Sequence, residues 1–580
     1  MRKVLEFLFL SVIAVISLSC NIDEEIASSY PKITLDSRTG VYSVKQGREI
    51  VIAPQYEYAE GATYRWTMDG RLLGTEPSLC FMREECGEYY IRLTITTAVG
   101  SDSEELRIDV KELETPTVDI NMADATVAIG YRKMLRATYR QTTLATKVVW
   151  SVNGTQVAED AGYAFEATEC GDYVITATAS NDDGTDSKSI TIKVVNIDEM
   201  PFAYTFDKTS YHTVVGRKLH IEPSFVSHDD IEYVWEVDGN YVGAWSADYT
   251  FQSDNVGEHT LRVTASKIVN PEQNKTPDVI VHEFSITVYE AGAYYRPRSG
   301  ASAAEWVKIY EYTPAPGQFI NELKTGGFDG TQTTPEAAIA YAEERMRKGN
   351  WVSLGGFGGY IIAGFDHSID NSGDYDIAIL GNSFDGSSEP GIVWVMQDEN
   401  GNGLPDDTWY ELAGSETGKA ETSQQYAITY YRPSAPQMPV QWTDNLGQSG
   451  QIEYLKSFHS QDYYYPLWIE AESYTLTGTC LEPRNYDKSG NGTYWVNKHF
   501  DWGYVDNFSP IDRLPGENSG AEGNAANYFK IANAIDFELE PIDLDYIDFV
   551  KVQVGVNAQS GWLGELSTEV CGISDYNMIK

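Results

Sequence analysis

A short pattern centred on a tryptophan occurs three times in the first half of this 580-residue chain. The copies are Tyr64–Gly70, Val148–Gly154 and Tyr233–Gly239, and their tryptophans are Trp66, Trp150 and Trp235. The tryptophans lie 84 and 85 residues apart, and a glycine follows each one after 21 or 22 residues. Alternating apolar and polar residues then follow, as in Tyr173–Ala179. A period of this length with short strands and a central tryptophan predicts tandem immunoglobulin-like β-sandwiches.

The end of each pattern predicts a tight turn. Asp69-Gly70, Asn153-Gly154 and Asp238-Gly239 each follow an apolar run closely. Asp-Gly and Asn-Gly pairs favour two-residue hairpins, because both central residues then adopt positive φ. We expect the three tryptophans to form the sandwich cores rather than ligand platforms.

The repeated W-x-[VM]-[DN]-G pattern, with the later glycine and aromatic of Gly87-Glu88-Tyr89 and Gly171-Asp172-Tyr173, resembles PKD domains. The resemblance extends over about residues 31–290 and implies three PKD-like modules, at 31–113, 114–197 and 198–290. Rows of such modules are typically spacers. The resemblance therefore implies that these modules hold the rest of the chain away from a surface.

The N-terminus predicts export. Met1-Arg2-Lys3 precedes an apolar run, Val4–Leu18, which is too short to span a bilayer comfortably. A basic start and a small-residue end are typical of a signal peptide, here residues 1–19. Cys20 lies where a bacterial lipobox has its acylated cysteine, and the acidic linker 20–30 resembles the surface-export signal of Bacteroidota lipoproteins. These resemblances imply a surface-exposed outer-membrane lipoprotein; an uncleaved anchor and a merely solvated linker are the alternatives.

Charge and cysteine content narrow the class of partner. The chain has 42 basic and 86 acidic residues, a net charge of −44, which disfavours nucleic acids and anionic lipid surfaces. We therefore expect membrane attachment only through the lipid anchor.

Five scattered cysteines remain after Cys20, and an odd number so widely spaced does not form a disulfide framework. The pairs Cys80–Cys86 and Cys480–Cys571 are possible bridges, and the spacing does not suggest a zinc site.

Residues 291–580 lack the repeat, and we refer to them as the head. Thr334-Pro335-Glu336 predicts a helix start and Gly349 its end, since Thr caps, Pro suits the first turn and Gly ends helices. Strands are predicted at 350–365, 375–381, Gly391–Gln397, Phe537–Leu539 and Tyr546–Val556. The fold class is therefore all-β, with three sandwiches followed by a larger jelly-roll-like β-sandwich that has one helix.

A calcium loop is predicted directly after the strand Gly391–Gln397. Asp398, Asn400 and Asn402 alternate, the Leu404 carbonyl can face inward, and Asp406 or Asp407 can close the shell. Calcium takes six to eight oxygen ligands at flexible distances, which such spacing supplies. The loop is not an EF-hand, because Trp409 occupies position 12 and strands flank it. The alternative is an acidic Asn-Gly turn without metal; an ion here would be structural.

Aromatic residues in the head are the candidate ligand platform. They are Tyr463, Tyr464, Tyr465, Trp468, Trp495, Trp502 and Trp562. Tyr and Trp combine a large contact area with a polar tip, which suits flat amphipathic ligands. Neighbouring side chains on a strand point to opposite faces, so core packing is the alternative for each.

Acidic and histidine residues give weaker signals. Asp366, Asp370, Asp374, Asp376 and Glu389 could include a carboxylate pair for glycosidic-bond cleavage; solvated turns or a second metal loop are the alternatives. His367, His459 and His499 lack metal-ligand spacing to one another. We therefore expect the head not to be an enzyme.

Several segments of the head together resemble a known group of proteins. They are Gly364–Ile369, Gly381–Phe384, Glu389–Gly391, the Asp398–Asp407 loop with Trp409–Leu412, and Gly561–Glu565. The resemblance is to the heads of BtuH-type cobalamin-binding lipoproteins of gut Bacteroidota. It implies capture of a cobamide (vitamin B12) as a ligand and transfer to an outer-membrane TonB-dependent transporter. Glycan binding and, less so, glycoside hydrolysis are the alternatives.

Overall fold

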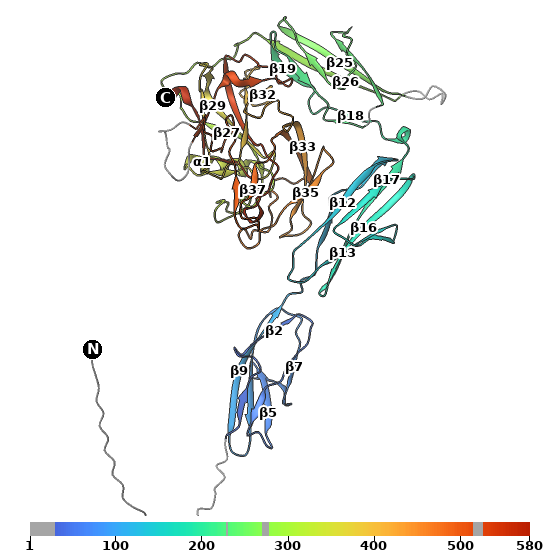
Figure 1. Ribbon diagram of the computed structural model, residues 1–580, viewed down its shortest axis with the longest axis vertical. Coiled ribbons are helices and arrows are strands. Elements are labelled where there is room, and N and C mark those ends of the chain that lie inside the picture. Colours follow the sequence, from blue (N-terminus) through green and yellow to red (C-terminus); the bar gives the residue numbers. More distant parts are fainter. Residues whose placement is uncertain (1–29, 228–229, 269–277, 514–525) are drawn as a thin grey trace, which may run out of the picture. The chain divides into compact units, whose positions relative to one another are not determined.

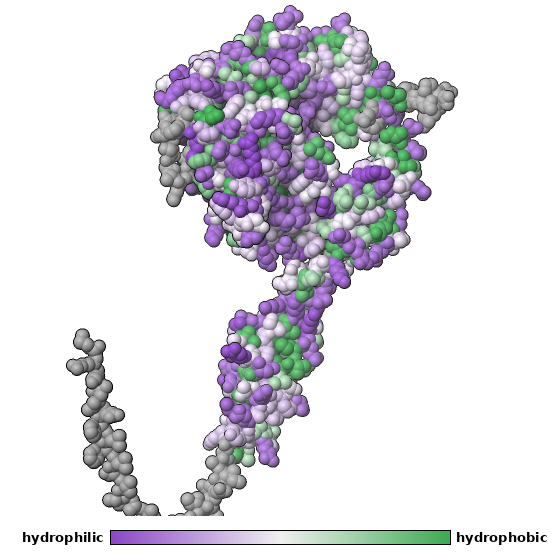
Figure 2. All heavy atoms as spheres, in the orientation of Figure 1, coloured by the Kyte–Doolittle hydropathy of each residue, from purple (hydrophilic) through white to green (hydrophobic). Residues whose placement is uncertain are grey.

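The computed structural model describes residues 30–227, 230–268, 278–513 and 526–580, which divide into two compact units at Glu114/Thr115. Cys20 and the signal peptide lie outside the described residues. Within the described ranges, no helix has both the length and the apolar character that crossing a bilayer requires. Figure 2 shows hydrophilic residues over much of the visible surface, in keeping with the acidic composition.

Module 1 is a sandwich with one five-stranded sheet (Figure 1). Its strands, in spatial order, are β2 (Val41–Lys45), β9 (Ser101–Lys111), β8 (Gly87–Thr96), β5 (Thr63–Met68) and β6 (Arg71–Gly74). The smaller layer contains β1 (Lys32–Thr34) with β4 (Gln55–Glu57), and β3 (Ile50–Ile52) with β7 (Leu79–Phe81). The strands β2 and β9 run parallel, and the other pairs are antiparallel.

Modules 2 and 3 repeat this strand order. The large sheet of module 2 has the order β11 (Ala125–Ala128), β17 (Gly184–Val195), β16 (Gly171–Asn181), β13 (Lys147–Val152) and β14 (Thr155–Ala158). The opposite sheet has the order β10 (Val118–Ile120), β12 (Arg132–Tyr139) and β15 (Gly162–Glu166). In module 3 the large sheet is β19 (Ser210–Val214), β26 (Val279–Tyr289), β25 (Gly257–Lys267), β22 (Ile231–Val237) and β23 (Asn240–Tyr241). Its opposite layer pairs β18 (Tyr204–Thr205) with β21 (Phe225–Val226), and β20 (Leu219–Ile221) with β24 (Tyr249–Phe251). A 3₁₀ turn, η1 (Ile197–Glu199), precedes module 3.

The tryptophans of the repeat form the module cores, as predicted. Trp66, Trp150 and Trp235 are each fully buried. Each indole N–H donates to a backbone carbonyl ten or eleven residues later, at 2.8 Å, 2.9 Å and 2.9 Å. A buried indole requires such an acceptor, so the same hydrogen bond recurs with the same packing.

The hairpin prediction is also confirmed. Asp69, Asn153 and Asp238 have φ of 48°, 48° and 50°, and the glycines that follow have φ of 77°, 79° and 74°. These values are those of the two-residue turn in which both central residues are left-handed.

The head is built on a six-stranded antiparallel sheet. Its order is β27 (Lys308–Thr313), β29 (Tyr360–Asp370), β41 (Tyr546–Val554), β31 (Gly391–Met396), β32 (Trp409–Leu412) and β40 (Ala534–Ile535). A four-stranded sheet has the order β35 (Ser449–Ile452), β34 (Val440–Asp444), β33 (Ser423–Tyr431) and β36 (Ser473–Cys480). The remaining sheets are β39 (Ala526–Phe529) with β30 (Ile377–Leu380) and β43 (Gly572–Asp575), β28 (Val352–Ser353) with β42 (Glu569–Val570), and β37 (Asn485–Asp487) with β38 (Trp495–Asn497). Short 3₁₀ turns are η3 (Ile531–Asn533), η4 (Gly561–Leu563) and η5 (Tyr576–Met578).

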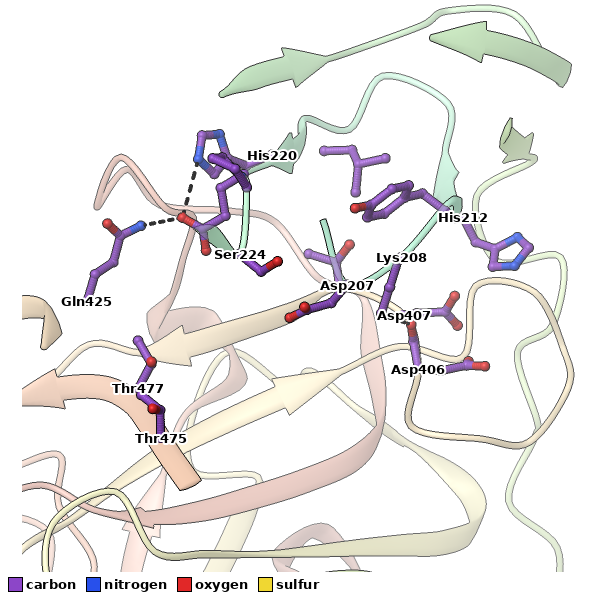
Figure 3. A pocket seen from close by; sticks show the side chains of 15 residues that line it. Asp207, Lys208, His212, His220, Ser224, Asp406, Asp407, Gln425, Thr475 and Thr477 are labelled. Carbon is purple, nitrogen blue, oxygen red and sulfur yellow. Dashed lines mark hydrogen bonds and ion pairs between the residues drawn. The ribbon is translucent and has the colours of Figure 1, made fainter. Parts of the chain in front are cut away.

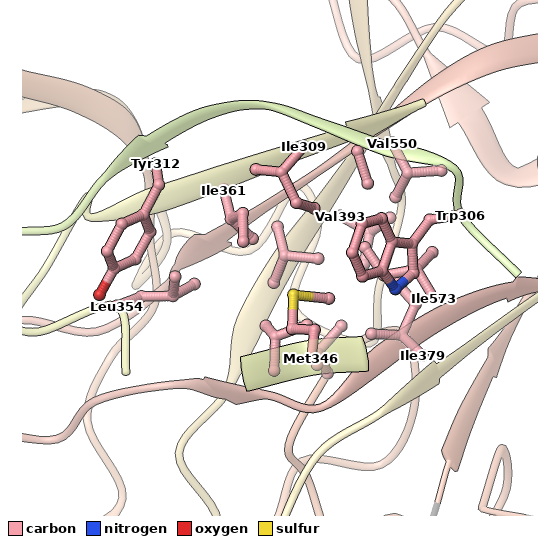
Figure 4. Close-up of a cluster of buried hydrophobic side chains, with 14 of the residues drawn as sticks. Trp306, Ile309, Tyr312, Met346, Leu354, Ile361, Ile379, Val393, Val550 and Ile573 are labelled. Atoms are coloured by element: carbon pink, nitrogen blue, oxygen red, sulfur yellow. The ribbon is translucent and has the colours of Figure 1, made fainter. Parts of the chain in front are cut away.

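The single helix α1 (Pro335–Arg347) closes one side of the head core. Thr334 Oγ1 accepts a hydrogen bond from the Ala337 N–H, Pro335 is the first helical residue, and Gly349 follows with a φ of 70°. The predicted start and end are therefore confirmed. Met346 of the helix packs among Ile309, Ile361 and Val393 of the sheet (Figure 4). An all-β fold with one helix is thus confirmed.

Two sequence expectations are wrong. Phe537–Leu539 is a turn, because Asp536 Oδ1 accepts from the N–H groups of Glu538 and Glu540 and Leu539 has a φ of 64°. The five cysteines of the described residues are free thiols, so neither proposed pair is a disulfide. Cys86 Sγ lies 2.9 Å from Gln46 Oε1, and Cys571 is buried with Sγ directed at the Gly381 carbonyl.

Candidate functional site

The loop between β31 and β32 is shaped by hydrogen bonds that its side-chain oxygens accept from its own backbone. Asp398 accepts hydrogen bonds from the N–H groups of Gly401 (2.8 Å) and Gly403 (3.0 Å). Asn400 Oδ1 accepts from Asn402 N–H at 2.8 Å, and Asn402 Oδ1 accepts from Leu404 N–H at 2.7 Å. These successive side-chain-to-backbone bonds are the local turns that Asp and Asn favour.

The acidic end of the loop folds back onto its beginning. Asn402 Nδ2 donates to both carboxylate oxygens of Asp406, at 3.1 Å and 3.0 Å, and Asn400 Nδ2 donates to Asp407 Oδ1 at 3.0 Å. Asp407 is buried, which raises the pKa of its carboxyl to about 7. The structure therefore brings together the side chains of the predicted ligands Asp398, Asn400, Asn402, Asp406 and Asp407. That of Leu404 is exposed, as a residue that offers only its carbonyl can be.

Module 3 holds the base of this loop through a buried ion pair. Arg217 Nη1 donates to Glu399 Oε1 at 2.5 Å and to Gln397 Oε1 at 2.6 Å. The Arg217 and Glu399 side chains are only 10% and 1% exposed. Burial raises the pKa of Glu399 to about 6, although the guanidinium opposes that rise. The Lys208 ammonium also donates to the Asp406 carbonyl at 2.7 Å.

A polar cavity of about 640 Å³ lies between module 3 and this part of the head (Figure 3). Its walls include Lys208 and His220 from module 3, and Asp406 and Thr477 from the head. His220 stacks on Phe537 with ring centroids 4.0 Å apart. This face is therefore an intramolecular interface with polar walls.

Modules 2 and 3 also make direct contacts with the head, which the spacer role implied by their resemblance does not require. Both lie in the same compact unit as the head. For module 2, Asp119 Oδ2 accepts from Ser434 N–H at 2.9 Å, and the Arg136 carbonyl accepts from Gln441 Nε2 at 3.2 Å. The repeat pattern did not reveal these contacts, because it reports module cores rather than module surfaces.

Three of the predicted platform aromatics belong to the head core, which corrects that assignment. Tyr464, Tyr465 and Trp468 are buried. Tyr464 and Tyr465 donate to the carbonyls of His459 (2.9 Å) and Ala471 (2.8 Å), and Trp468 stacks between aromatic rings. Backbone acceptors for both hydroxyls explain how consecutive tyrosines are buried together.

Among the other platform candidates, Trp562 is the exposed one. Its side chain is 45% exposed, and its ring centroid lies 5.6 Å from that of Phe458, which is 58% exposed. Leu563 beside it is also exposed, and we call Phe458, Trp562 and Leu563 the aromatic patch. Trp495 is half-buried against the same turn, since a Cβ at Gly561 would lie 2.4 Å from its Nε1.

The remaining two candidates, Tyr463 and Trp502, have other surroundings. Tyr463 is half-buried, and its carbonyl accepts from Asn321 Nδ2 at 2.9 Å. Trp502 is half-buried and lines a smaller cavity of about 340 Å³ with Ile511 and Lys530. The sequence could not distinguish these three environments, because each side chain lies in a loop-rich, glycine-rich segment.

The predicted acidic cluster divides into separate networks. Asp366 pairs with His367 Nδ1 at 2.7 Å, and His367 Nε2 lies 3.0 Å from Asp575. Asp374 pairs with Lys530 at 3.1 Å. The other carboxylates accept local hydrogen bonds: Asp370 from the Tyr295 hydroxyl, and Asp376 from Ser372 and Ile531. Of the other histidines, His459 packs on Phe319 with ring centroids 4.8 Å apart and His499 is exposed.

Glu389 belongs instead to a group that sequence reasoning missed. One carboxylate oxygen each from Glu389, Asp506 and Glu569 lie within 4.8 Å of one another, and we call these residues the carboxylate triad. Burial raises the pKa of all three, and the neighbouring carboxylates add to the rise at Glu389 and Glu569. The three residues are 117 and 63 positions apart, so local spacing offered no signal for the group.

Comparison with known proteins identifies the first module. A family model described as "PKD-like domain" matches residues 30–97. Among curated proteins nothing matches. Solved structures with similarity include the I67–I69 fragment of titin (16% identity, TM-score 0.21, covering 45% of this chain and 98% of that one). The three N-terminal domains of the Hoc outer capsid protein of bacteriophage RB49 are similar at 12% identity, with a TM-score of 0.22 and coverage of 45% and 99%. Scores this low add nothing to the strand order described above. From that strand order and the matched model, the chain is an all-β protein that contains PKD-like, immunoglobulin-like domains.

Proposed function

We propose that this chain is a lipid-anchored, surface-displayed binding protein whose head captures a cobamide and passes it to an outer-membrane TonB-dependent transporter. The observation that carries the proposal is the aromatic patch, where Phe458 and Trp562 are paired and exposed on the head. Singly exposed apolar residues are common, whereas adjacent exposed aromatics are typical of binding surfaces. The acylated Cys20 would supply the anchor.

The chemistry around the patch suits a broad, flat ligand with an amide rim. Trp562 and Phe458 offer apolar ring faces, and the half-buried Trp495 has an indole N–H without an acceptor among the described residues. Amide side chains adjoin the turn: Asn485 Nδ2 donates to the Gln559 carbonyl at 2.8 Å, two residues before Gly561. Rings for the ligand faces and amides for its rim match the usual composition of a small-molecule site.

A structural calcium ion in the Asp398–Asp407 loop is part of the same proposal. The loop offers side-chain oxygens from five residues and the carbonyl of Leu404, which suits calcium coordination. Calorimetric titration of the full chain with calcium, compared with Asp398→Ala/Asp406→Ala, tests it. We expect heat from the wild type that the variant lacks; equal heats would remove calcium from this loop.

Retention of cyanocobalamin tests the ligand assignment. The immobilised full chain is equilibrated with micromolar cyanocobalamin, and retained ligand is measured by visible absorbance. We expect retention by the wild type and a loss of about tenfold or more in Trp562→Ala, because one aromatic anchor contributes 2 kcal/mol or more at a binding hot spot. Trp245→Ala is the matched control, since Trp245 of module 3 is 69% exposed and belongs to another surface.

Cyanocobalamin retention, together with a polysaccharide gel and a glycoside turnover assay, separates cobamide binding from glycan binding and from hydrolysis. A chain that fails to retain cyanocobalamin but shifts in a polysaccharide gel binds glycans, and the cobamide assignment is then wrong. Glycoside turnover abolished by Asp366→Asn would establish an enzyme. Surface display is tested separately by protease treatment of intact cells, which should release the head; protection would place it in the periplasm.

A further inference from the structure

We infer that the carboxylate triad of Glu389, Asp506 and Glu569 is a binding site for a hard divalent cation, of the class that calcium fills. This site is distinct from the Asp398–Asp407 loop. Its residues come from three separate segments of the head: the approach to β31, the segment after Tyr504, and the start of β42.

Backbone hydrogen bonds hold these three segments together. Glu389 N–H donates to the Asp506 carbonyl at 2.9 Å, and Glu569 N–H donates to Asp506 Oδ2 at 3.0 Å. Gly391 and Val505 exchange a pair of backbone hydrogen bonds, at 3.0 Å and 2.9 Å. The Thr568 hydroxyl donates to the Glu389 carbonyl at 2.9 Å. The carboxylates are therefore fixed in place by the main chain, as a preformed ion site requires.

The hydrogen bonds leave acceptor capacity unused inside the triad. Glu569 is buried, and its Oε1 has no hydrogen-bond donor among the described residues. A buried carboxylate oxygen without a donor is costly, and two carboxylates beside it add repulsion. A dication placed among the three oxygens would remove both costs, so the buried oxygen without a donor points to such a ligand.

Ser383 offers a further oxygen close to Asp506. Ser383 is buried, its N–H donates to the Asp506 carboxylate, and its Oγ has no partner among the described residues. The guanidinium of Arg513 lies near this segment: its Nη2 donates to the Ser383 carbonyl at 3.2 Å, and its charge interacts with that of Asp506. One guanidinium does not balance three carboxylates, and a dication would supply the remaining charge.

The donor set selects the class of cation. All candidate ligands are oxygens, which suit calcium, magnesium and manganese, whereas zinc and copper favour histidine nitrogen and cysteine sulfur. Three carboxylates in a largely buried site supply most of a calcium shell, with hydroxyl, carbonyl or water oxygens completing it. Magnesium prefers to keep several waters, for which burial leaves less room.

The site has a structural consequence for the head. Glu569 follows Trp562 by seven residues, in the segment that also carries Glu565, whose Oε1 accepts from Gln318 N–H at 2.7 Å. An ion at the triad would tie the C-terminal part of this segment to Glu389 and Asp506. It would thereby restrict the turn that presents the aromatic patch.

The test uses the full chain, stripped with a chelator, in the Asp398→Ala/Asp406→Ala background so that the loop site is absent. Calcium chloride is titrated calorimetrically, and thermal unfolding is followed with calcium and with chelator. We expect one remaining calcium site and a rise in Tm with calcium. Adding Glu569→Gln should weaken that site at least tenfold, whereas the matched control Asp374→Asn, an exposed carboxylate paired with Lys530, should leave it unchanged.

The thermal data keep the inference testable if a variant folds poorly. In chelator, Glu569→Gln should unfold at the same temperature as its parent or higher, because the substitution removes a repelled carboxylate. In the presence of calcium, Glu569→Gln should instead unfold at a lower temperature than its parent. A folded Asp398→Ala/Asp406→Ala chain that neither binds calcium nor gains Tm would overturn the inference, and so would binding that Glu569→Gln does not weaken. Cyanocobalamin retention is measured independently, so failure of one proposal is distinguishable from failure of the other.

Discussion

The PKD-like modules and the head differ most in what they bury. Each module surrounds one tryptophan with apolar side chains, and its buried polar residues are few: Asn121, Thr138, Thr213 and Lys267 among those described. The head encloses many carboxylates. The buried ones among the described residues are Glu322, Asp376, Asp398, Glu399, Asp407, Glu411, Asp506, Asp512, Asp548, Glu565, Glu569 and Asp575.

The two regions therefore differ in how burial affects their stability. Apolar burial around a tryptophan stabilises a sandwich and places few demands on its partners. A buried carboxylate destabilises the fold unless hydrogen bonds, a cation or a proton compensates it. A region that retains many of them is a candidate for binding and chemistry, which favours the head as the functional part of the chain.

The modules also differ from one another at an equivalent position. Gly47 in module 1 and Gly216 in module 3 have φ of 69° and 76°, and each N–H donates to a backbone carbonyl in the same sandwich at 2.8 Å. An arginine follows each glycine. Arg48 is exposed, whereas Arg217 forms the buried pair with Glu399 of the head. One turn geometry thus serves both a solvent-exposed and an interface position.

The largest expected effects come from the module cores. Trp66→Ala and Trp235→Ala should each lower the free energy of unfolding by about 3–5 kcal/mol, since each removes a fully buried indole. In calorimetric scans we expect Trp66→Ala to shift the transition of residues 1–114 and Trp235→Ala that of residues 115–580. If Trp66→Ala moved both transitions equally, the division into two units would be wrong.

Arg217→Ala should cost about 3 kcal/mol or more, because it leaves the Glu399 carboxylate buried without its cation. Arg48→Ala is the matched control and should change the free energy of unfolding by less than about 0.5 kcal/mol. Denaturant unfolding of both variants measures the difference. Equal effects would show that the two turns are equivalent in energy as well as in shape.

Buried carboxyls of the head should make its stability depend on pH. Burial raises the pKa of Glu411 from 4.5 to about 7, with Thr479 as a hydrogen-bond donor and Lys551 as a nearby cation. Between these values the folded state binds more protons than the unfolded state, so stability falls as pH rises, by up to about 3 kcal/mol. The half-buried Lys551, whose pKa desolvation lowers to about 8, acts in a separate window above that pH.

Glu411→Gln should therefore reduce the slope of the stability profile between pH 4.5 and 7, and the remaining slope would come from Glu399 and Asp407, whose pKa values are also raised. The measurement is denaturant unfolding of residues 115–580 within the full chain at half-unit pH steps. Trp66→Ala serves as the reference, because a module-core change should leave the shape of that profile unaltered. An unchanged slope in Glu411→Gln would show that this carboxyl does not contribute to it.

The smallest expected effect is at the stack between module 3 and the head. His220 and Phe537 lie 4.0 Å apart with ring planes 11° from parallel. Loss of one such aromatic pair costs about 1 kcal/mol. His220→Ala should therefore lower the free energy of unfolding by that amount, and His499→Ala, at an exposed position, by much less.

The sequence contained enough information for the modules, the helix and the turns of the Asp398–Asp407 loop. The modules repeat three times, α1 has explicit end signals, and the residues of the Asp398–Asp407 loop are close together in the chain. Each of these patterns is local, so no knowledge of the tertiary fold was needed.

The rest depended on contacts between distant residues. Tyr464, Tyr465 and Trp468 read equally well as surface or core, because burial depends on which carbonyls the fold places near their hydroxyls. The carboxylate triad joins positions 389, 506 and 569, and the Arg217–Glu399 pair joins positions 182 residues apart. Spacing along a chain cannot report such pairs.

The glycine turns before Arg48 and Arg217 have a practical consequence. Each turn is closed by main-chain hydrogen bonds within its own sandwich, so the residue after the glycine can be exchanged without altering the strands. Transplanting the Gly216–Lys218 tripeptide onto another sandwich of this type would graft an attachment point for an acidic neighbour.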